Sequence, residues 1–203
     1  ELMENSIDAG ADRIEVDVED GGRKLICIRD NGAGMSGEDL AAAFESHSTS
    51  KISNSSQLEQ ISTLGFRGEA LASIASVAMV KARSRTRDSQ QANCIEIDCG
   101  DKGKVRPCSG DYGTRIEVRD IFYKLPARRK FLKTANTEMG HITKHFTRIA
   151  LAAGELDLTL RHNGKEVYRL TADQDLRGRI AELFSKDVAD NLLETKCREK
   201  YIE

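Results

Sequence analysis

The chain has 203 residues, of which 39% are hydrophobic and 32% are charged, and its formal net charge at pH 7 is −2. These values are typical of a globular chain long enough for one domain and part of another, and they exclude a chain that is disordered throughout. The slightly acidic balance argues against strong nonspecific binding of nucleic acid by this chain, because such binding needs a basic surface.

The cysteines do not have the spacing of a metal site or a disulfide framework. There are five of them, without a CxxC pair, at Cys27, Cys94, Cys99, Cys108 and Cys197. The sequence has no apolar run of membrane-spanning length and no signal-peptide pattern, so we expect no membrane partner. A reducing compartment fits best, which means the cytoplasm of a bacterium or the nucleus of a eukaryote.

The first ten residues, ELMENSIDAG, have the spacing of a helix that is already under way at Glu1, so we expect the natural N-terminus to lie upstream. Glu1, Asn5 and Asp8 share one face of this helix. A solvated polar face would explain them. Alternatively, the carboxylate activates water and the amide oxygen binds a hard cation, provided that a phosphate-binding segment lies elsewhere in the chain.

Residues 13–29 alternate between apolar and polar side chains around an Asp-Gly-Gly turn, which predicts an antiparallel hairpin. The sequence DNGAG then places Asp30 at a strand end, followed by Gly32 and Gly34. A plain turn has this composition. Alternatively, the glycines let the backbone approach a flat ring while the carboxylate accepts a hydrogen bond from an exocyclic amine such as that of adenine.

A short helix is predicted from about Glu38, and a long polar segment follows it. The sequence GFRGEAL then puts Gly65 and Gly68 at the entrance to another helix, where free backbone N–H groups suit an anion such as a phosphate. A glycine-flanked helix start without a ligand is the alternative. Lys51, in the polar segment, is either a solvated lysine or a point charge that reaches a phosphate.

Further strands are predicted over 78–86, 94–99 and 114–122. Pro126 fits the first turn of a helix through 127–133, and Thr137 is predicted to cap a longer helix that Gly154 ends. The buried face of that helix is predicted to carry Ile142, Phe146, Ile149 and Ala153. Residues 156–170 are predicted to form a hairpin around Asn163 and Gly164, and a helical pattern begins at about residue 172.

These elements predict an α+β fold, an α/β sandwich with a mixed, largely antiparallel sheet and helices on one face. Residues 1–171 are expected to form one domain, and 172–203 the start of a truncated second domain. Two weaker signals, for a zinc site and for a DNA-binding patch, do not support a function. His141 and His145 have zinc-pair spacing without a third ligand, and the basic ARRKFLK segment at 127–133 suits internal ion pairs about as well as DNA phosphates.

Four short motifs in register resemble the nucleotide-binding motifs of the gyrase, heat-shock chaperone, histidine kinase and MutL ATPase superfamily. They are Glu1-x-x-x-Asn5, Asp30-x-Gly32-x-Gly34, Gly65-Phe66-Arg67-Gly68-Glu69 and Gly113-Thr114. The sequences ENSIDAGA, STSK, LGFRGEALASI and FY followed by PARRKFL resemble the MutL mismatch-repair family in particular. The resemblance runs from residue 1 to about residue 170.

The resemblance implies a role for each motif. Glu1 would polarise the attacking water, Asn5 would bind Mg²⁺, and Asp30 would recognise the adenine amine with help from Thr114. Gly32 and Gly34 would let the base lie against the backbone. Residues 46–69 would form a lid that becomes ordered over the triphosphate, with Thr49, Ser50, Lys51, Gly65, Phe66, Arg67 and Gly68 near the nucleotide.

The same resemblance implies ATP and Mg²⁺ as ligands, an ATP-dependent dimer, and contact with DNA, a mismatch-recognition protein and downstream repair factors through the full-length protein. Lys124 and Leu125 depart from the family, which commonly has Asn-Thr there. The family also has an upstream dimerisation segment and a second-domain lysine that this chain does not contain. We therefore expect the chain to bind nucleotide better than it hydrolyses it.

Three other functions fit parts of the sequence. A nucleotide-gated interaction module without significant turnover would need the same ATP site, but it would leave Glu1 without a use. A histidine kinase would need a histidine-bearing coiled-coil helix, which the sequence lacks. A type II topoisomerase subunit would share the ATP site but not the PARRKFL sequence.

Overall fold

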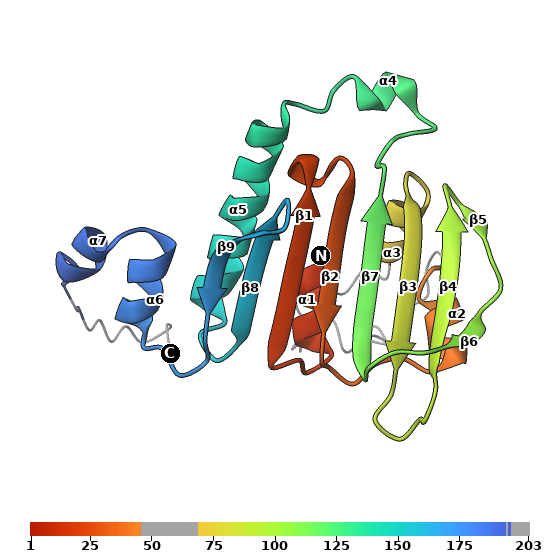
Figure 1. The fold of residues 1–203 in the computed structure, drawn as a ribbon, viewed down its shortest axis with the longest axis horizontal. Coiled ribbons are helices and arrows are strands. Elements are labelled where there is room, and N and C mark those ends of the chain that lie inside the picture. The colour runs from red at the N-terminus through yellow and green to blue at the C-terminus, as the bar shows by residue number, and fades with distance from the viewer. Residues whose placement is uncertain (46–68, 194, 196–203) are drawn as a thin grey trace, which may run out of the picture.

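The computed structural model describes residues 1–45, 69–193 and 195. Its centre is a nine-stranded sheet with the order β5-β4-β3-β7-β2-β1-β8-β9, in which β6 pairs with β4 (Figure 1). The strands are β1 (Arg13–Glu19), β2 (Leu25–Asp30), β3 (Met79–Arg85), β4 (Ala92–Asp98), β5 (Asp101–Lys102), β6 (Arg106–Cys108), β7 (Gly113–Arg119), β8 (Asp157–His162) and β9 (Lys165–Leu170). The mixed, largely antiparallel sheet confirms the predicted α+β class.

Both predicted hairpins are present. β1 and β2 pair antiparallel, with Ile14 opposite Asp30, and the turn between them is a short 3-10 helix, η1 (Asp20–Gly22). In the β8–β9 hairpin, Asn163 and Gly164 both have positive φ, as expected for the tight turn that an Asn-Gly pair favours. The pairing of β1 with β8 is parallel, and no local sequence pattern predicts it.

The helices α1, α2, α3 and α5 lie on one face of the sheet (Figure 1). The helices are α1 (Leu2–Asp8), α2 (Gly37–Ala42), α3 (Ala70–Ala75), α4 (Pro126–Arg129), α5 (Ala135–Ala152), α6 (Leu176–Leu183) and α7 (Lys186–Asp190). Side chains alternate between the two faces of a strand, so Val16, Ile28 and Ile116 are buried under the helices. Their strand neighbours face outward and are mostly charged.

Two helices differ from the prediction. The helix predicted from Pro126 through 127–133 is only the four-residue α4, and none of its residues is buried by the described part of the chain. The predicted cap of α5 is wrong by three positions, because the Thr134 side chain accepts a hydrogen bond from the backbone N–H of Thr137. A helix with no buried face has little to stabilise it, which explains why α4 stops early.

A buried arginine joins the C-terminal helices to the elements before them. Arg179 in α6 is fully buried, and its guanidinium donates to the carbonyls of Ala150 and Ala153 at the end of α5 and to those of Leu156 and Thr171. The division at residue 171 stays a prediction. Within the described part of the chain, no helix is both long and apolar enough to cross a membrane.

Candidate functional site

The first contact of the site joins α1 to the end of β2. Ser6 is buried on the inner side of α1, and its Oγ donates to Asp30 Oδ2 at 2.9 Å. Asp30 lies on the helix-facing side of the sheet, since it is paired with the inward-facing Ile14. The helix that carries Glu1 and Asn5 is therefore attached directly to the carboxylate that the sequence singles out.

Asp30 is a buried carboxylate with three internal donors. Besides Ser6, the backbone N–H groups of Gly32 and Thr114 donate to Oδ1 at 3.0 Å and 3.2 Å. Burial raises the pKa of the Asp30 carboxyl, and the three hydrogen bonds act in the opposite direction. Because a carboxylate offers about four lone-pair positions, the three donors in the described part of the chain leave one position for a further donor.

A second group of polar side chains continues from Thr114 into β3. The Ser84 and Thr114 hydroxyl oxygens are 2.8 Å apart, and Ser84 Oγ also lies 3.0 Å from the Gly113 carbonyl oxygen. The backbone N–H of Met35 donates to Ser84 Oγ at 2.8 Å. The segment after β2 is thereby held against β3 and β7, and Asp30 and Thr114 share one rigid surface.

The glycines of the DNGAG segment have packing reasons of their own. A Cβ on Gly32 would lie 2.8 Å from the Ala9 carbonyl oxygen, and one on Gly34 would lie 2.1 Å from that of Arg85. Gly34 also has a φ of +71°, which L side chains rarely adopt. These glycines let the segment pass close to α1 and β3. Whether they also allow a base to lie against the backbone stays a prediction.

The other predicted residues are placed as follows. Glu1 precedes the first residue of α1 and is exposed, and Asn5 lies one turn further along, partly buried. Thr114 lies opposite Asp30 in the β2–β7 pairing. The structure thus brings Asp30 and Thr114 together and attaches α1 to them through Ser6, whereas the roles of Glu1 and Asn5 stay predictions. The remaining predicted residues lie outside the described part of the chain: Thr49, Ser50, Lys51, Gly65, Phe66, Arg67 and Gly68.

Sequence reasoning missed Ser6 and Ser84. Each is almost completely buried, at 4% and 1% exposure, and each completes the hydrogen bonding around Asp30 or Thr114. A signal for Ser84 was present, because it occupies the inward position after Val80 and Ala82 in an alternating strand. A lone hydroxyl among inward-facing apolar residues needs a polar partner, and Ser84 finds its partners in Met35, Gly113 and Thr114.

The Asp30 carboxylate suits an amine donor, and the Asn5 side chain on the attached helix suits a hard cation that accompanies an anion. The described residues contain no group of three metal-ligating His, Cys, Asp or Glu side chains, and His141 and His145 accordingly lack a third ligand there. Mg²⁺ does not require such a cage, because it commonly keeps several waters and is completed by phosphate oxygens. The amide oxygen of Asn5, as one oxygen ligand, fits that mode of binding.

Comparison with known proteins first defines the class. Residues 1–109 match the family model described as histidine kinase-, DNA gyrase B-, and HSP90-like ATPase. These residues include α1, Asp30 and the glycines that follow it. The chain belongs to this ATPase family, and within it to the MutL group, as the sequence comparisons show.

The chain is 51% identical over 176 residues to the DNA mismatch repair protein MutL of Pseudomonas fluorescens, a match that covers 86% of this chain and 28% of the relative. It is 50% identical over 182 residues to the MutL protein of Klebsiella pneumoniae, covering 88% of this chain and 29% of the relative. The chain thus spans about three tenths of the length of these curated relatives.

A solved structure supports the same family. The Aquifex aeolicus MutL ATPase domain complexed with ADP matches with a TM-score of 0.70 and 33% sequence identity, over 90% of this chain and 65% of that one. This match, together with the sequence relatives, confirms the family that the motifs indicated and the α+β architecture.

Proposed function

We propose that this chain is the part of a MutL-type mismatch-repair protein that binds Mg²⁺-ATP and hydrolyses it. The observation that carries the proposal is the buried Asp30 carboxylate, for which the described residues supply three donors and leave one acceptor position. A buried charge with unused hydrogen-bonding capacity is costly for a folded protein unless a ligand uses it. The exocyclic amine of adenine supplies the missing donor.

The two polar residues of α1 would act on the phosphate end of the nucleotide. Glu1 would accept a proton from the attacking water, and the Asn5 side-chain oxygen would hold Mg²⁺ beside the phosphates. When bound, Mg²⁺ supplies positive charge that neutralises the phosphate oxygens. The Ser6–Asp30 hydrogen bond supports these roles, because it fixes the position of the helix that carries both residues relative to the adenine site.

Changes of shape and assembly are part of the proposal. Residues 46–69 would become ordered over the triphosphate and drive an ATP-dependent dimer, and residues 172–203 would begin a second domain. The full-length protein would bind DNA, a mismatch-recognition protein and downstream repair factors. The four described cysteines are free, which suits a reducing compartment such as the bacterial cytoplasm.

A nucleotide-gated interaction module with little turnover is the second candidate. It uses the same adenine site, so Asp30 does not distinguish the two. The Glu1 carboxylate favours hydrolysis instead, because binding alone gives a carboxylate in that helix no obvious use. The two candidates differ in whether bound ATP is consumed in the full-length protein.

Calorimetric titration of a slowly hydrolysed ATP analogue with Mg²⁺ tests the site. Saturable binding is expected, together with much weaker binding of the matching GTP analogue, whose ring carries an oxygen where adenine carries the amine. Asp111→Asn is a matched control, because Asp111 is an exposed carboxylate whereas that of Asp30 is buried. Asp30→Asn should weaken the binding strongly, whereas Asp111→Asn should leave it unchanged. Equal affinities for the two analogues would contradict the adenine site.

A further inference from the structure

The outward face of the sheet, opposite the helices, carries charged side chains in rows across the strands. One row crosses the sheet from β4 to β8. Its neighbouring charges have opposite sign, except where the neutral Cys27 separates two carboxylates. It runs through Glu96, Lys81, Glu117, Cys27, Asp17 and Arg161 in successive paired positions. Lys81 bonds Glu96 at 2.9 Å, and Arg161 lies 3.4 Å from Asp17, so this row is largely paired within itself.

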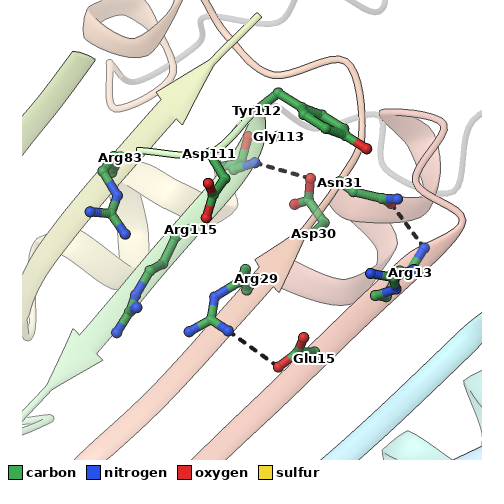
Figure 2. A pocket seen from close by; sticks show the side chains of 11 residues that line it. Arg13, Glu15, Arg29, Asp30, Asn31, Arg83, Asp111, Tyr112, Gly113 and Arg115 are labelled. Carbon is green, nitrogen blue, oxygen red and sulfur yellow. Dashed lines mark hydrogen bonds and ion pairs between the residues drawn. The ribbon is translucent and has the colours of Figure 1, made fainter. Parts of the chain in front are cut away.

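The adjacent row has three arginines side by side. Arg83 in β3 is paired with Arg115 in β7, and Arg115 is paired with Arg29 in β2. Figure 2 shows the three side chains on the same side of the sheet, with Glu15 at the end of the row. Neighbouring strands are about 4.8 Å apart, so the backbone positions of the three arginines span only about 10 Å. Like charges directly opposite each other destabilise a sheet.

The internal partners of these arginines use only part of their hydrogen-bonding capacity. Arg29 contacts Glu15 at 3.2 Å, Arg83 donates to the Ser109 carbonyl at 3.1 Å, and Arg115 contacts Glu117 at 2.8 Å. Each guanidinium has five N–H donors in a planar fork. Arg115 Nε is buried and has no hydrogen-bond partner among the described residues. Glu15 is also shared with Arg161 at 2.8 Å, which weakens its hold on Arg29.

The arginines surround a cavity of about 280 Å³. Arg13 joins them, and Tyr112 and Asp111 lie at its border (Figure 2). Four arginines and three carboxylates, those of Glu15, Asp30 and Asp111, line the cavity, and the Asp30 carboxylate is already bonded by Ser6. The cavity therefore has an excess of positive charge and room for a small anion.

We propose that this cavity is a phosphate-binding site, in which Arg29, Arg83 and Arg115 hold a phosphate group of a ligand from the outward face of the sheet. A tetrahedral phosphate accepts paired hydrogen bonds from planar guanidinium forks. It also supplies the negative charge that the arginine row lacks. The phosphate belongs either to a small free metabolite or to a nucleic-acid backbone, since both present the same oxygens.

Asp30 and Thr114 also border this cavity, but the arginine side chains that would hold the phosphate lie on the other face of the sheet from the Asp30 carboxylate. Side chains at adjacent strand positions point to opposite faces, so Arg29 and Arg115 are outward where Asp30 and Thr114 are inward. The inference therefore does not depend on the proposed ATPase function. A chain that binds no ATP could still bind phosphate here, and the reverse also holds.

An NMR titration of the isotopically labelled chain locates the binding. Inorganic phosphate is added at constant ionic strength, with chloride as the reference anion, and a short oligothymidylate is added in a second series. Saturable shifts of the Arg29, Arg83 and Arg115 signals are expected. Saturation by inorganic phosphate at the lower concentration of phosphate groups assigns a small metabolite, and saturation by the oligonucleotide at the lower concentration assigns a nucleic-acid backbone. If neither probe shifts these signals, the proposal is overturned.

Two variants make the test specific. Arg115→Gln should raise the dissociation constant for the better probe by about 10- to 100-fold, as for loss of a charge-assisted hydrogen-bonded contact. Arg106→Gln is the matched control, because Arg106 is an exposed arginine that is paired with Glu96 at 2.9 Å. An equal loss in both variants would mean general attraction to positive charge and would overturn the proposal.

The thermal midpoint gives an independent readout. Without phosphate, Arg115→Gln should melt at a higher temperature than the unchanged chain, since it removes the central repulsive charge. Phosphate should raise the midpoint of the unchanged chain above its value in chloride, and that of Arg115→Gln by much less at the same concentration, because stabilisation by a ligand grows with its affinity for the folded state. A phosphate effect of equal size in both proteins would contradict the assignment.

Discussion

Replacing Asp30 by Asn should weaken nucleotide binding without destabilising the empty protein. The substitution keeps the shape of the side chain and removes its charge. In Asp30→Asn the carboxamide oxygen can keep the hydrogen bonds from the backbone N–H groups of Gly32 and Thr114. The new amide group then faces Ser6, whose hydroxyl can donate to the Leu2 carbonyl, 3.3 Å away, and accept from the amide.

The expected magnitude follows from opposing effects. A hydrogen bond to a charged acceptor contributes about 1.5–3 kcal/mol and one to a neutral acceptor about 0.5–1.5 kcal/mol, so the two backbone bonds lose roughly 2 kcal/mol together. The variant gains stability because it no longer buries a charged carboxylate, and such burial costs several kcal/mol per ion. Burial raises the pKa of Asp30 despite its hydrogen bonds, so the burial cost outweighs them. At pH 7 the free energy of unfolding should stay equal or rise by up to about 2 kcal/mol.

The pH dependence has a definite sign. The folded protein keeps the Asp30 proton to a higher pH than the unfolded chain, in which the carboxyl has its ordinary pKa of 3.8. The stability of the unchanged protein should therefore fall as pH rises from that value through the raised folded pKa, and then level off. Asp30→Asn lacks this contribution, so its advantage should grow over the same window.

Urea unfolding between about pH 4 and pH 8, followed by circular dichroism, measures both effects, and calorimetry measures nucleotide affinity on the same samples. Affinity for the ATP analogue should fall about 10- to 150-fold, which corresponds to one hydrogen bond between a neutral donor and a charged acceptor. A loss of stability of more than about 1 kcal/mol at pH 7 would refute the claim that burial of the charge outweighs its hydrogen bonds. Unchanged nucleotide affinity would refute the role of Asp30.

Three further changes have defined outcomes. Arg179→Met should lower the free energy of unfolding in urea by about 2–4 kcal/mol, because the cost of leaving four buried backbone carbonyls without their donor exceeds the gain from removing a buried cation. Gly34→Ala should destabilise the protein by at least about 3 kcal/mol, since its Cβ would meet the Arg85 carbonyl oxygen at 2.1 Å. Glu1→Gln in the full-length protein should reduce ATP turnover about 10²- to 10⁴-fold and leave nucleotide affinity nearly unchanged, because a general base acts in the chemical step.

Each of these changes has a matched control. Arg177→Met alters an exposed arginine of the same helix and should cost little. Gly10→Ala tests positive φ alone, because Gly10 has a φ of +69° and open space around it. Glu4→Gln alters a neighbouring carboxylate of α1 and should leave turnover intact. If a control matches its partner variant in effect, the stated physical reason is wrong.

Local patterns were sufficient for much of the fold. Alternation in β1, β2, β7 and β8 predicted strands, and the Asn163-Gly164 pair predicted the turn between β8 and β9. The same patterns failed where packing decides. The 127–133 segment has helical composition, but only α4 forms, because none of its four residues is buried against the described part of the chain. Thr134 rather than Thr137 caps α5, and a composition with two threonines does not distinguish them.

The site divides in the same way. The sequence by itself singled out Asp30, its glycines and the polar residues of α1, because each motif is short and contiguous. Ser6, Ser84 and the arginine row came only from the tertiary structure. Alternation assigns a side chain to a face, but the pairing register decides its neighbours, and that register brings together Arg29, Arg83 and Arg115 from three distant parts of the chain. Which charges meet on a sheet is a property of long-range pairing, and no local pattern contains it.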